Sequence, residues 1–201
     1  MAPLKAVRSS PPSELPGPEI RPARPPGFRN SRAAIVTEVE LHKKLLNRAG
    51  TFLSRRPCSR GELALVLLKI AGPDSVEPVL DRLEQLNLLN DTEYAYNFAF
   101  NQLKVKGWGP VRVFQDLLLR KVSPELAEST MNSIQTTLTE QEVLEGYLER
   151  YGRRKRLPAD RRGVASLVSH LRRRGFVEDT IIQMLRRKLS PTVWENFETG
   201  E

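Results

Sequence analysis

The stretch Leu86-Asn-Leu-Leu-Asn-Asp-Thr-Glu-Tyr-Ala-Tyr-Asn-Phe98 joins two predicted helices and sets the pattern for the rest of the chain. Its apolar run ends the first helix at Leu89. Asn90 then offers a side-chain oxygen that can cap the next helix, with Glu93 as the reciprocal partner of a capping box. Beyond the cap, apolar side chains follow at close to helical spacing: Tyr94, Ala95, Phe98 and Leu103. The stretch therefore predicts two helices with a short turn between them.

The same order of helix starts recurs along the chain. The segment from Gly61 aligns with the segment from Gly109, and both align with residues 162–185, at offsets of about 48 and 54 residues. A period near fifty is typical of stacked helical units that cannot bury their apolar faces alone. No alternating apolar–polar run bounded by hairpin turns occurs, so we predict an all-α protein. Its three tandem three-helix units are expected over residues 38–89, 90–137 and 139–189.

Capping residues and prolines predict where the individual helices begin. Residues 38–54 carry an amphipathic stripe, and Ser59 with Glu62 predicts a capping box for a second helix that ends near Ala71. A third helix is expected from Asp74 or Ser75, which would keep Pro78 in its first turn. The remaining predicted starts are Asn90, Pro110, Ser123, Thr139 with Glu142 as a capping box, Pro158, and the Gly175-Phe176 turn.

The composition suits one helical domain with extensions. The chain has 201 residues, of which 39% are hydrophobic and only 6% aromatic. A single cysteine, Cys58, excludes an internal disulfide framework and fits a reducing compartment. The chain has neither a run of about 18 apolar residues nor the apolar core of a secretory signal. We therefore expect a soluble cytoplasmic protein, with a monomer as the simplest state and no membrane contact.

Both ends of the chain differ from the repeats. Residues 1–33 are rich in proline and poor in apolar side chains, so we expect a disordered extension. An organellar transit peptide is the alternative, because this segment also holds several arginines. Residues 191–201 form a tail in which Trp194 and Phe197 are expected to fold back on the last unit. The repeat domain is thus expected over residues 34–190.

The net charge of +8 is concentrated in the last unit. Residues 146–190 hold 13 basic and 4 acidic side chains, whereas the rest of the chain is close to neutral. Arginine suits phosphate because its planar guanidinium group binds oxygen pairs and stays charged. A basic surface also attracts polyanions, with binding that weakens steeply with salt. For any single cluster, a solvated helix face or favourable charge near a helix C-terminus is the alternative.

The candidate residues for binding an anionic partner are the basic clusters of the last unit and a smaller group in the middle unit. They are Arg153, Arg154, Lys155, Arg156, Arg161, Arg162, Arg172, Arg173, Arg174, Arg186, Arg187, Lys188, Lys104, Lys106 and Arg112. Three basic residues of the first unit, Arg55, Arg56 and Arg60, occupy comparable loop positions. We hypothesise that these groups continue one basic track. Acidic residues of the first two units could face basic loops of a protein partner: Glu77, Asp81, Glu84, Asp91 and Glu93.

No pattern in the chain indicates catalysis, a metal site or a cofactor. His42 has only Glu38 one helical turn away, and His170 is expected to be a surface residue. Cys58 has basic neighbours that could favour its thiolate, but it lacks a histidine partner. Most aromatic residues fall at core spacing. Trp108, between two glycines, is expected either to contact a partner or to plug the junction between units.

The quoted junction at Leu86–Ala95 and the following Lys-x-x-Gly-x-Gly-Pro-x-Arg-Val over residues 104–113 resemble the RecX family of bacterial recombination regulators. The resemblance covers about residues 40–190. It implies an elongated, curved stack of three-helix units that binds the RecA recombinase filament on DNA. It also implies that the protein usually restrains ATP hydrolysis and strand exchange by RecA in recombination, DNA repair and the SOS response. Asn101 stands near a position where family members commonly carry a basic residue.

Two other functions are the alternatives. A helical protein that binds nucleic acid without sequence preference would compete for DNA and need no dedicated protein partner. A purely structural scaffold would leave the arginine excess of the last unit unexplained.

Overall fold

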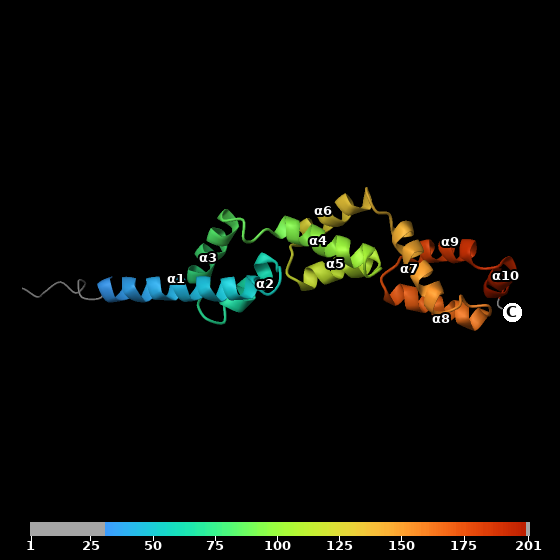
Figure 1. Ribbon diagram of the computed structural model, residues 1–201, viewed down its shortest axis with the longest axis horizontal. Coiled ribbons are helices and arrows are strands. Elements are labelled where there is room, and N and C mark those ends of the chain that lie inside the picture. Colours follow the sequence, from blue (N-terminus) through green and yellow to red (C-terminus); the bar gives the residue numbers. More distant parts are fainter. Residues whose placement is uncertain (1–30, 200–201) are drawn as a thin grey trace, which may run out of the picture. The chain divides into compact units, whose positions relative to one another are not determined.

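The computed structural model describes residues 31–199, and every regular element in that range is an α-helix (Figure 1). The predictions for residues 1–30, which include most of the expected extension, lie outside the described residues. The chain up to Thr37 is a unit separate from Glu38–Glu201, and the structure describes only the start of a helix in it. The all-α prediction is confirmed.

The helices follow the expected order of three consecutive groups of three. The first group is α1 (Ser31–Leu53), α2 (Arg60–Leu67) and α3 (Pro73–Gln85). The second is α4 (Asp91–Lys104), α5 (Pro110–Leu119) and α6 (Pro124–Gln135). The third is α7 (Glu140–Arg154), α8 (Arg161–Arg173) and α9 (Glu178–Lys188), followed by α10 (Pro191–Thr199).

Several predicted caps are present, but only one of the predicted capping boxes within residues 31–199 is complete. The side chain of Thr139 accepts from the Glu142 amide, and the Glu142 carboxylate accepts from the Thr139 amide. Asn90 caps α4 through the Glu93 amide at 3.1 Å, and Ser59 caps α2 through the Glu62 amide at 3.0 Å. The reciprocal half of the predicted Ser59 box is replaced, because the Glu62 carboxylate binds Arg56 and Arg120.

Four predicted boundaries are wrong. Helix α2 ends at Leu67 rather than near Ala71. Helix α1 begins at Ser31 rather than Glu38, before the amphipathic stripe on which the prediction rested. Helix α3 begins at Pro73, so Pro78 lies inside the helix and leaves the carbonyl four residues earlier without its usual donor. Helix α8 begins at Arg161 rather than Pro158, because the Asp160 side chain accepts from the Gly163 amide and caps the helix there.

The buried apolar side chains form two cores. One belongs to the first unit and includes Leu45, Leu63 and Leu80. The other runs through the second and third units, from Ala95 on α4 to Trp194 on α10. Helix α10 contacts α8 and α9, so the predicted return of the tail onto the last unit is confirmed. The second and third units therefore share their hydrophobic stabilisation.

The junctions between successive units repeat the same arrangement of helix start and turn, although the donors differ. The Gly109 amide, at the start of α5, donates to the Arg174 carbonyl at 2.8 Å, and the Val111 amide donates to the Gly175 carbonyl at 3.2 Å. One unit earlier, the Ser59 hydroxyl donates to the Arg120 carbonyl. In both cases the start of the second helix of one unit meets the turn that follows the second helix of the next.

Candidate functional site

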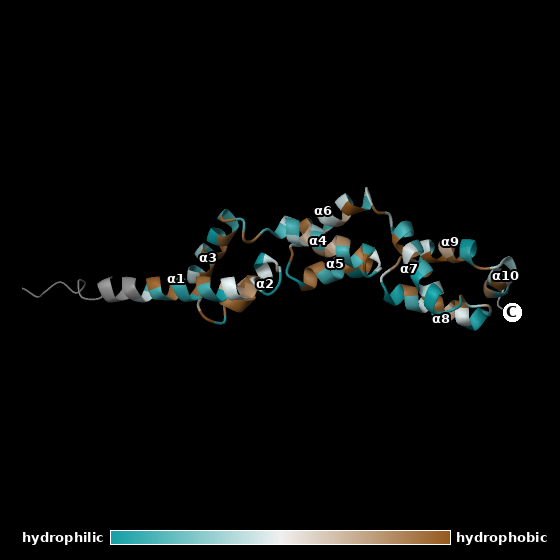
Figure 2. Ribbon diagram, in the orientation of Figure 1, coloured by the Kyte–Doolittle hydropathy of each residue, from teal (hydrophilic) through white to brown (hydrophobic). Residues whose placement is uncertain are grey.

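The basic residues of the third unit gather around the connection between α7 and α8. Lys155, Arg156 and Arg173 line a cavity of about 310 Å³, together with His170 and the ring of Tyr151. Both ends of α8 are hydrophilic in Figure 2. Lys155 at the end of α7, Arg156 in the following loop and Arg173 at the end of α8 therefore line the same cavity. Such a cluster of cations is the arrangement needed to hold an anion such as phosphate.

Helix polarity explains some of these charges but not all of them. Arg153 and Arg154 end α7, and Arg172 and Arg173 end α8. The helix dipole stabilises positive charge at these C-terminal ends. Arg161 and Arg162 instead occupy the first turn of α8, where the dipole disfavours a positive charge. The helix dipole therefore does not account for the positive charge at the start of α8.

His170 is half-buried rather than on the surface as expected, and its surroundings disfavour the charged imidazolium. Its Nε2 lies 2.7 Å from the hydroxyl of Tyr147. Burial lowers the pKa of His170, and the nearby Arg174 and Arg173 lower it further. The positive charge of the cavity thus comes from Lys155, Arg156 and Arg173.

Two predicted binding residues, Arg112 and Arg174, stack their guanidinium groups on the ring of Trp108. Their guanidinium carbons lie 3.9 and 4.0 Å from the centre of the Trp108 ring, and Arg174 also lies 4.3 Å from the Tyr147 ring. Arg174 donates further to the carbonyls of Lys106 and Gly107, at 2.6 and 3.0 Å. We name these interactions the arginine clasp. Trp108 thus plugs the junction between the second and third units, as one of the two predictions for it proposed.

Arg120 is the residue that the sequence analysis missed. It occupies the C-cap of α5 as Arg174 occupies that of α8, and its guanidinium lies 4.5 Å from the Phe98 ring. It also donates to the Tyr94 hydroxyl at 3.1 Å and pairs with Glu62 at 3.4 Å. The signal was present, because the repeat alignment places an arginine at the end of the second helix in both units.

The remaining basic residues of the third unit differ in their surroundings. Arg172 pairs with Glu178, and Lys188 pairs with Glu145 at 2.6 Å. Arg186 and Arg187 are exposed in the last turn of α9. The surface charge of α9 is therefore partly neutralised within the unit.

The charged residues of the first unit largely bind one another. Arg60 pairs with Glu77, Asp81 and Glu84 at 2.6–2.8 Å. Arg56 pairs with Glu62 at 3.1 Å. Arg60 is therefore not available to the hypothesised basic track. Three of the five acidic residues expected to face a partner, Glu77, Asp81 and Glu84, are paired with Arg60 instead.

In the middle unit, Lys104 and Lys106 are both exposed. The ammonium group of Lys104 lies 5.3 Å from the Phe100 ring, and Lys106 lines a second cavity. These two residues are therefore the exposed candidates of that unit.

No arrangement for metal chemistry occurs within residues 31–199, where no group of three or more His, Cys, Asp or Glu side chains could hold an ion. Cys58 is buried, and burial raises its pKa to about 11, opposite to the shift that its basic neighbours suggested. Of the described helices, none has the length and apolar character needed to cross a membrane.

Comparison with known proteins gives consistent results in sequence and structure. A family model described as RecX, second three-helix domain, matches residues 90–131. The regulatory protein RecX of Prosthecochloris aestuarii is 32% identical over 156 residues, covering 74% of this chain and 95% of that protein. The regulatory protein RecX of Leptothrix cholodnii is 32% identical over 143 residues, covering 71% and 87%.

Two solved structures share the fold. A crystal structure of regulatory protein RecX superposes with a TM-score of 0.64 at 19% identity, covering 79% of this chain and 78% of that chain. The crystal structure of RecX from Lactobacillus salivarius gives a TM-score of 0.63 at 22% identity, covering 74% and 97%.

Proposed function

The chain belongs to the RecX family of regulatory proteins, and from this premise we propose that it binds the RecA recombinase filament on DNA and restrains it. In this role it lowers the ATP hydrolysis and strand exchange of the recombinase, acting as a monomer in the cytoplasm. The chain itself acts by binding, and the hydrolysis belongs to its partner. Its relatives are named regulatory proteins, which supports a regulatory role.

The observation that carries the proposal is the α7–α8 cavity with Lys155, Arg156 and Arg173 on its walls. Phosphates along a DNA strand are the polyanion that such a site would meet inside a filament. Successive helical units offer several modest contacts at once, and such multivalency raises the overall affinity without one strong site. Contacts to both recombinase and DNA would then hold the protein on the filament.

The first test is DNA-dependent ATP hydrolysis by the cognate RecA, with this protein added at low ratios and constant salt. We expect inhibition at about one copy per ten or more recombinase subunits, because a regulator that acts on the filament affects many subunits at once. The variant Arg156→Glu/Arg173→Glu should lose most of this inhibition. The control Arg48→Glu reverses an exposed arginine on α1, away from the cavity, and should inhibit like the wild type.

The competing function is binding to DNA without a protein partner, which the same cavity would support. It predicts inhibition only when enough protein is present to coat the DNA, with recovery on adding more DNA. Equal inhibition by Arg156→Glu/Arg173→Glu and by the wild type would refute the role given to the cavity.

A further inference from the structure

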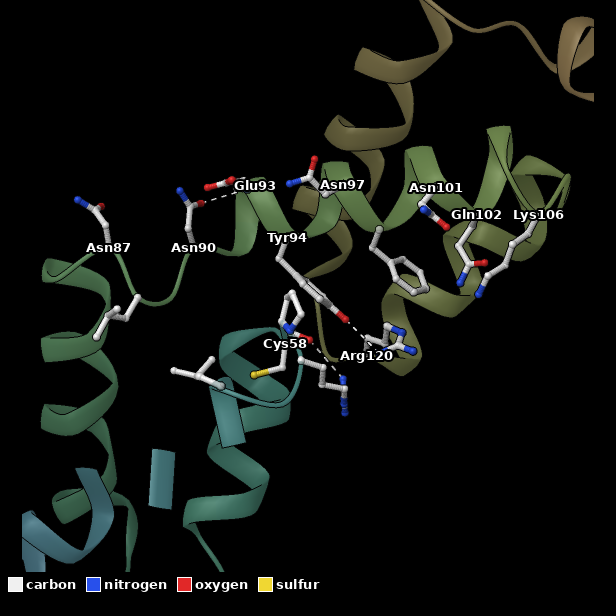
Figure 3. A pocket seen from close by; sticks show the side chains of 15 residues that line it. Cys58, Asn87, Asn90, Glu93, Tyr94, Asn97, Asn101, Gln102, Lys106 and Arg120 are labelled. Carbon is white, nitrogen blue, oxygen red and sulfur yellow. Dashed lines mark hydrogen bonds between the residues drawn. The ribbon is translucent and has the colours of Figure 1, made fainter. Parts of the chain in front are cut away.

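A second cavity, of about 530 Å³, lies between the loop that precedes α2 and one face of α4 (Figure 3). Tyr94 reaches from α4 toward Arg120, whose guanidinium group donates to the tyrosine hydroxyl. The walls combine aromatic rings, side-chain amides and cations, and the volume falls within the range of small-ligand sites. The described lining of the α7–α8 cavity holds no such set of amides.

Gln102 places a hydrogen-bond acceptor without a partner in this wall. The residue is only 8% exposed, and its Oε1 is buried and receives no hydrogen bond from any described residue. An unsatisfied buried carbonyl opposes folding, since burial removes its water and nothing replaces it. Rotation of the side chain into the cavity would let a ligand with an N–H donor satisfy this carbonyl. Asn97 and Asn101, one turn and one residue away on α4, add further amides to the lining.

The aromatic and charged groups of the lining suit a flat ring attached to a phosphate. The rings of Tyr94 and Phe98 stack with their centres 6.1 Å apart and an angle of 24° between them. Lys106 supplies positive charge, and Arg56 and Arg120 share the single carboxylate of Glu62, which leaves one net positive charge between them. Glu93 is the one carboxylate of the described lining. Single-stranded nucleic acid is bound in this way, by bases stacked on aromatic side chains and phosphates held by cations.

We propose that this cavity receives one unstacked base of single-stranded DNA, a base with an exocyclic amino group, namely adenine or cytosine. The Gln102 side chain rotates into the cavity so that Oε1 accepts from the amino group, the ring lies against Tyr94, and the adjoining phosphates lie near Lys106 and Arg56. Asn and Gln amides pair well with the edge of adenine, whereas thymine presents a carbonyl where adenine presents its amino group. The inference rests on the proposed function in that DNA is the polymer bound, and it adds a preference among bases that phosphate contacts do not give.

The test is the affinity of the purified protein for oligonucleotides, measured by fluorescence anisotropy without the recombinase. The probes are a 15-nucleotide thymidine strand and two strands in which the central base is adenine or cytosine. We expect the wild type to bind at least one substituted strand about fivefold more tightly than the all-thymidine strand, the value of one net hydrogen bond. Gln102→Leu, of similar volume but without the carbonyl, should abolish this difference and leave the affinity for the all-thymidine strand unchanged.

Two controls separate binding from folding. Gln102→Leu removes a buried unsatisfied group, so a melting temperature at or above that of the wild type shows that the variant folds. Asn101→Ala alters an exposed amide of the cavity and should reduce the preference even if Gln102→Leu proves unstable. Asn132→Ala, the same change at an exposed position on α6, should bind every strand like the wild type.

Equal affinity of the wild type for all three strands would overturn the proposal, as would a preference that survives both Gln102→Leu and Asn101→Ala. If Gln102→Leu instead weakens binding to the recombinase filament while oligonucleotide binding is unchanged, the cavity holds a protein segment and the base assignment is wrong. These results do not depend on inhibition of ATP hydrolysis, so a failure here is distinguishable from a failure of the proposed function.

Discussion

Replacing Gly109 by alanine should loosen the junction between the second and third units. A Cβ at this position would lie within 3.0 Å of the Gly175 carbonyl and of the Phe176 amide. Both neighbours are backbone, held by the turn that follows α8, so neither can rotate away as a side chain would. Gly175 has a φ of +87°, a conformation that glycine adopts without strain, which further fixes the turn. The added methyl group must therefore push the two segments apart.

Steric overlap and weakened hydrogen bonds together set the size of this effect. Overpacking against rigid surroundings costs about 1–3 kcal/mol. Separation also weakens the hydrogen bonds from the Gly109 and Val111 amides to the turn, at about 1 kcal/mol each. The expected loss in the free energy of unfolding is thus about 3–5 kcal/mol, or roughly 6–20 °C in melting temperature for a chain of this size.

Thermal and urea unfolding followed by circular dichroism measure this loss, and Gly146→Ala provides the matched control. A Cβ at Gly146, inside α7, meets nothing within 4 Å. Alanine there should stabilise the protein by about 0.5–1 kcal/mol, because it favours the helix more than glycine does. The two identical substitutions should therefore shift stability in opposite directions. A melting temperature for Gly109→Ala within about 2 °C of the wild type, the effect of about 1 kcal/mol, would refute this view of the junction.

Three further predictions concern single side chains. Arg174→Lys keeps the charge of the arginine clasp but loses the planar guanidinium group, so the free energy of unfolding in urea should fall by about 1–2 kcal/mol. The exposed control Arg186→Lys should lower it by less than about 0.5 kcal/mol. The pKa of His170 lies below its ordinary value of 6.5, so its contribution to stability is present above pH 6.5 and is lost as the pH falls below that value. The melting temperature of His170→Gln should therefore decline less than that of the wild type over this pH range. Identical pH profiles of the two proteins would contradict the assignment. The thiol of Cys58, buried and with its pKa raised to about 11, should react with a disulfide reagent at pH 8 far more slowly in the native protein than in urea, and equal rates would show that it is accessible.

Local signals in the sequence predicted most helix starts. The caps at Asn90, Ser123 and Thr139 and the prolines at the starts of α5 and α6 lie where the pattern placed them. Such signals work because a cap and its amide are only three residues apart in the chain. The start of α8 was misplaced because Pro158 and Asp160 offer competing signals, and the Asp160 side chain reaches the amide of Gly163.

The candidate site was predicted less completely, because charge shows in the sequence but ion pairing does not. Arg60 looked like part of a basic track, yet it binds three carboxylates on α3. These partners lie 17 or more residues away along the chain, and only the packing of α2 against α3 brings them together. The positive charge of the third unit could be predicted from the sequence alone, because its basic residues outnumber its carboxylates whatever ion pairs form.

The sequence by itself determined the helical class, the threefold repetition and the unit that carries the positive charge, since each of these depends on residue type and spacing along the chain. Only the tertiary structure decided which charges remain available. Arg173 and Arg174 are neighbours in sequence, yet Arg173 lines the α7–α8 cavity while Arg174 packs on Trp108. Successive residues at a helix end point about 100° apart, so one can face solvent while the next faces the adjoining unit. Which of the two does so is decided by the packing of Trp108 and Gly107 from the second unit against the end of α8.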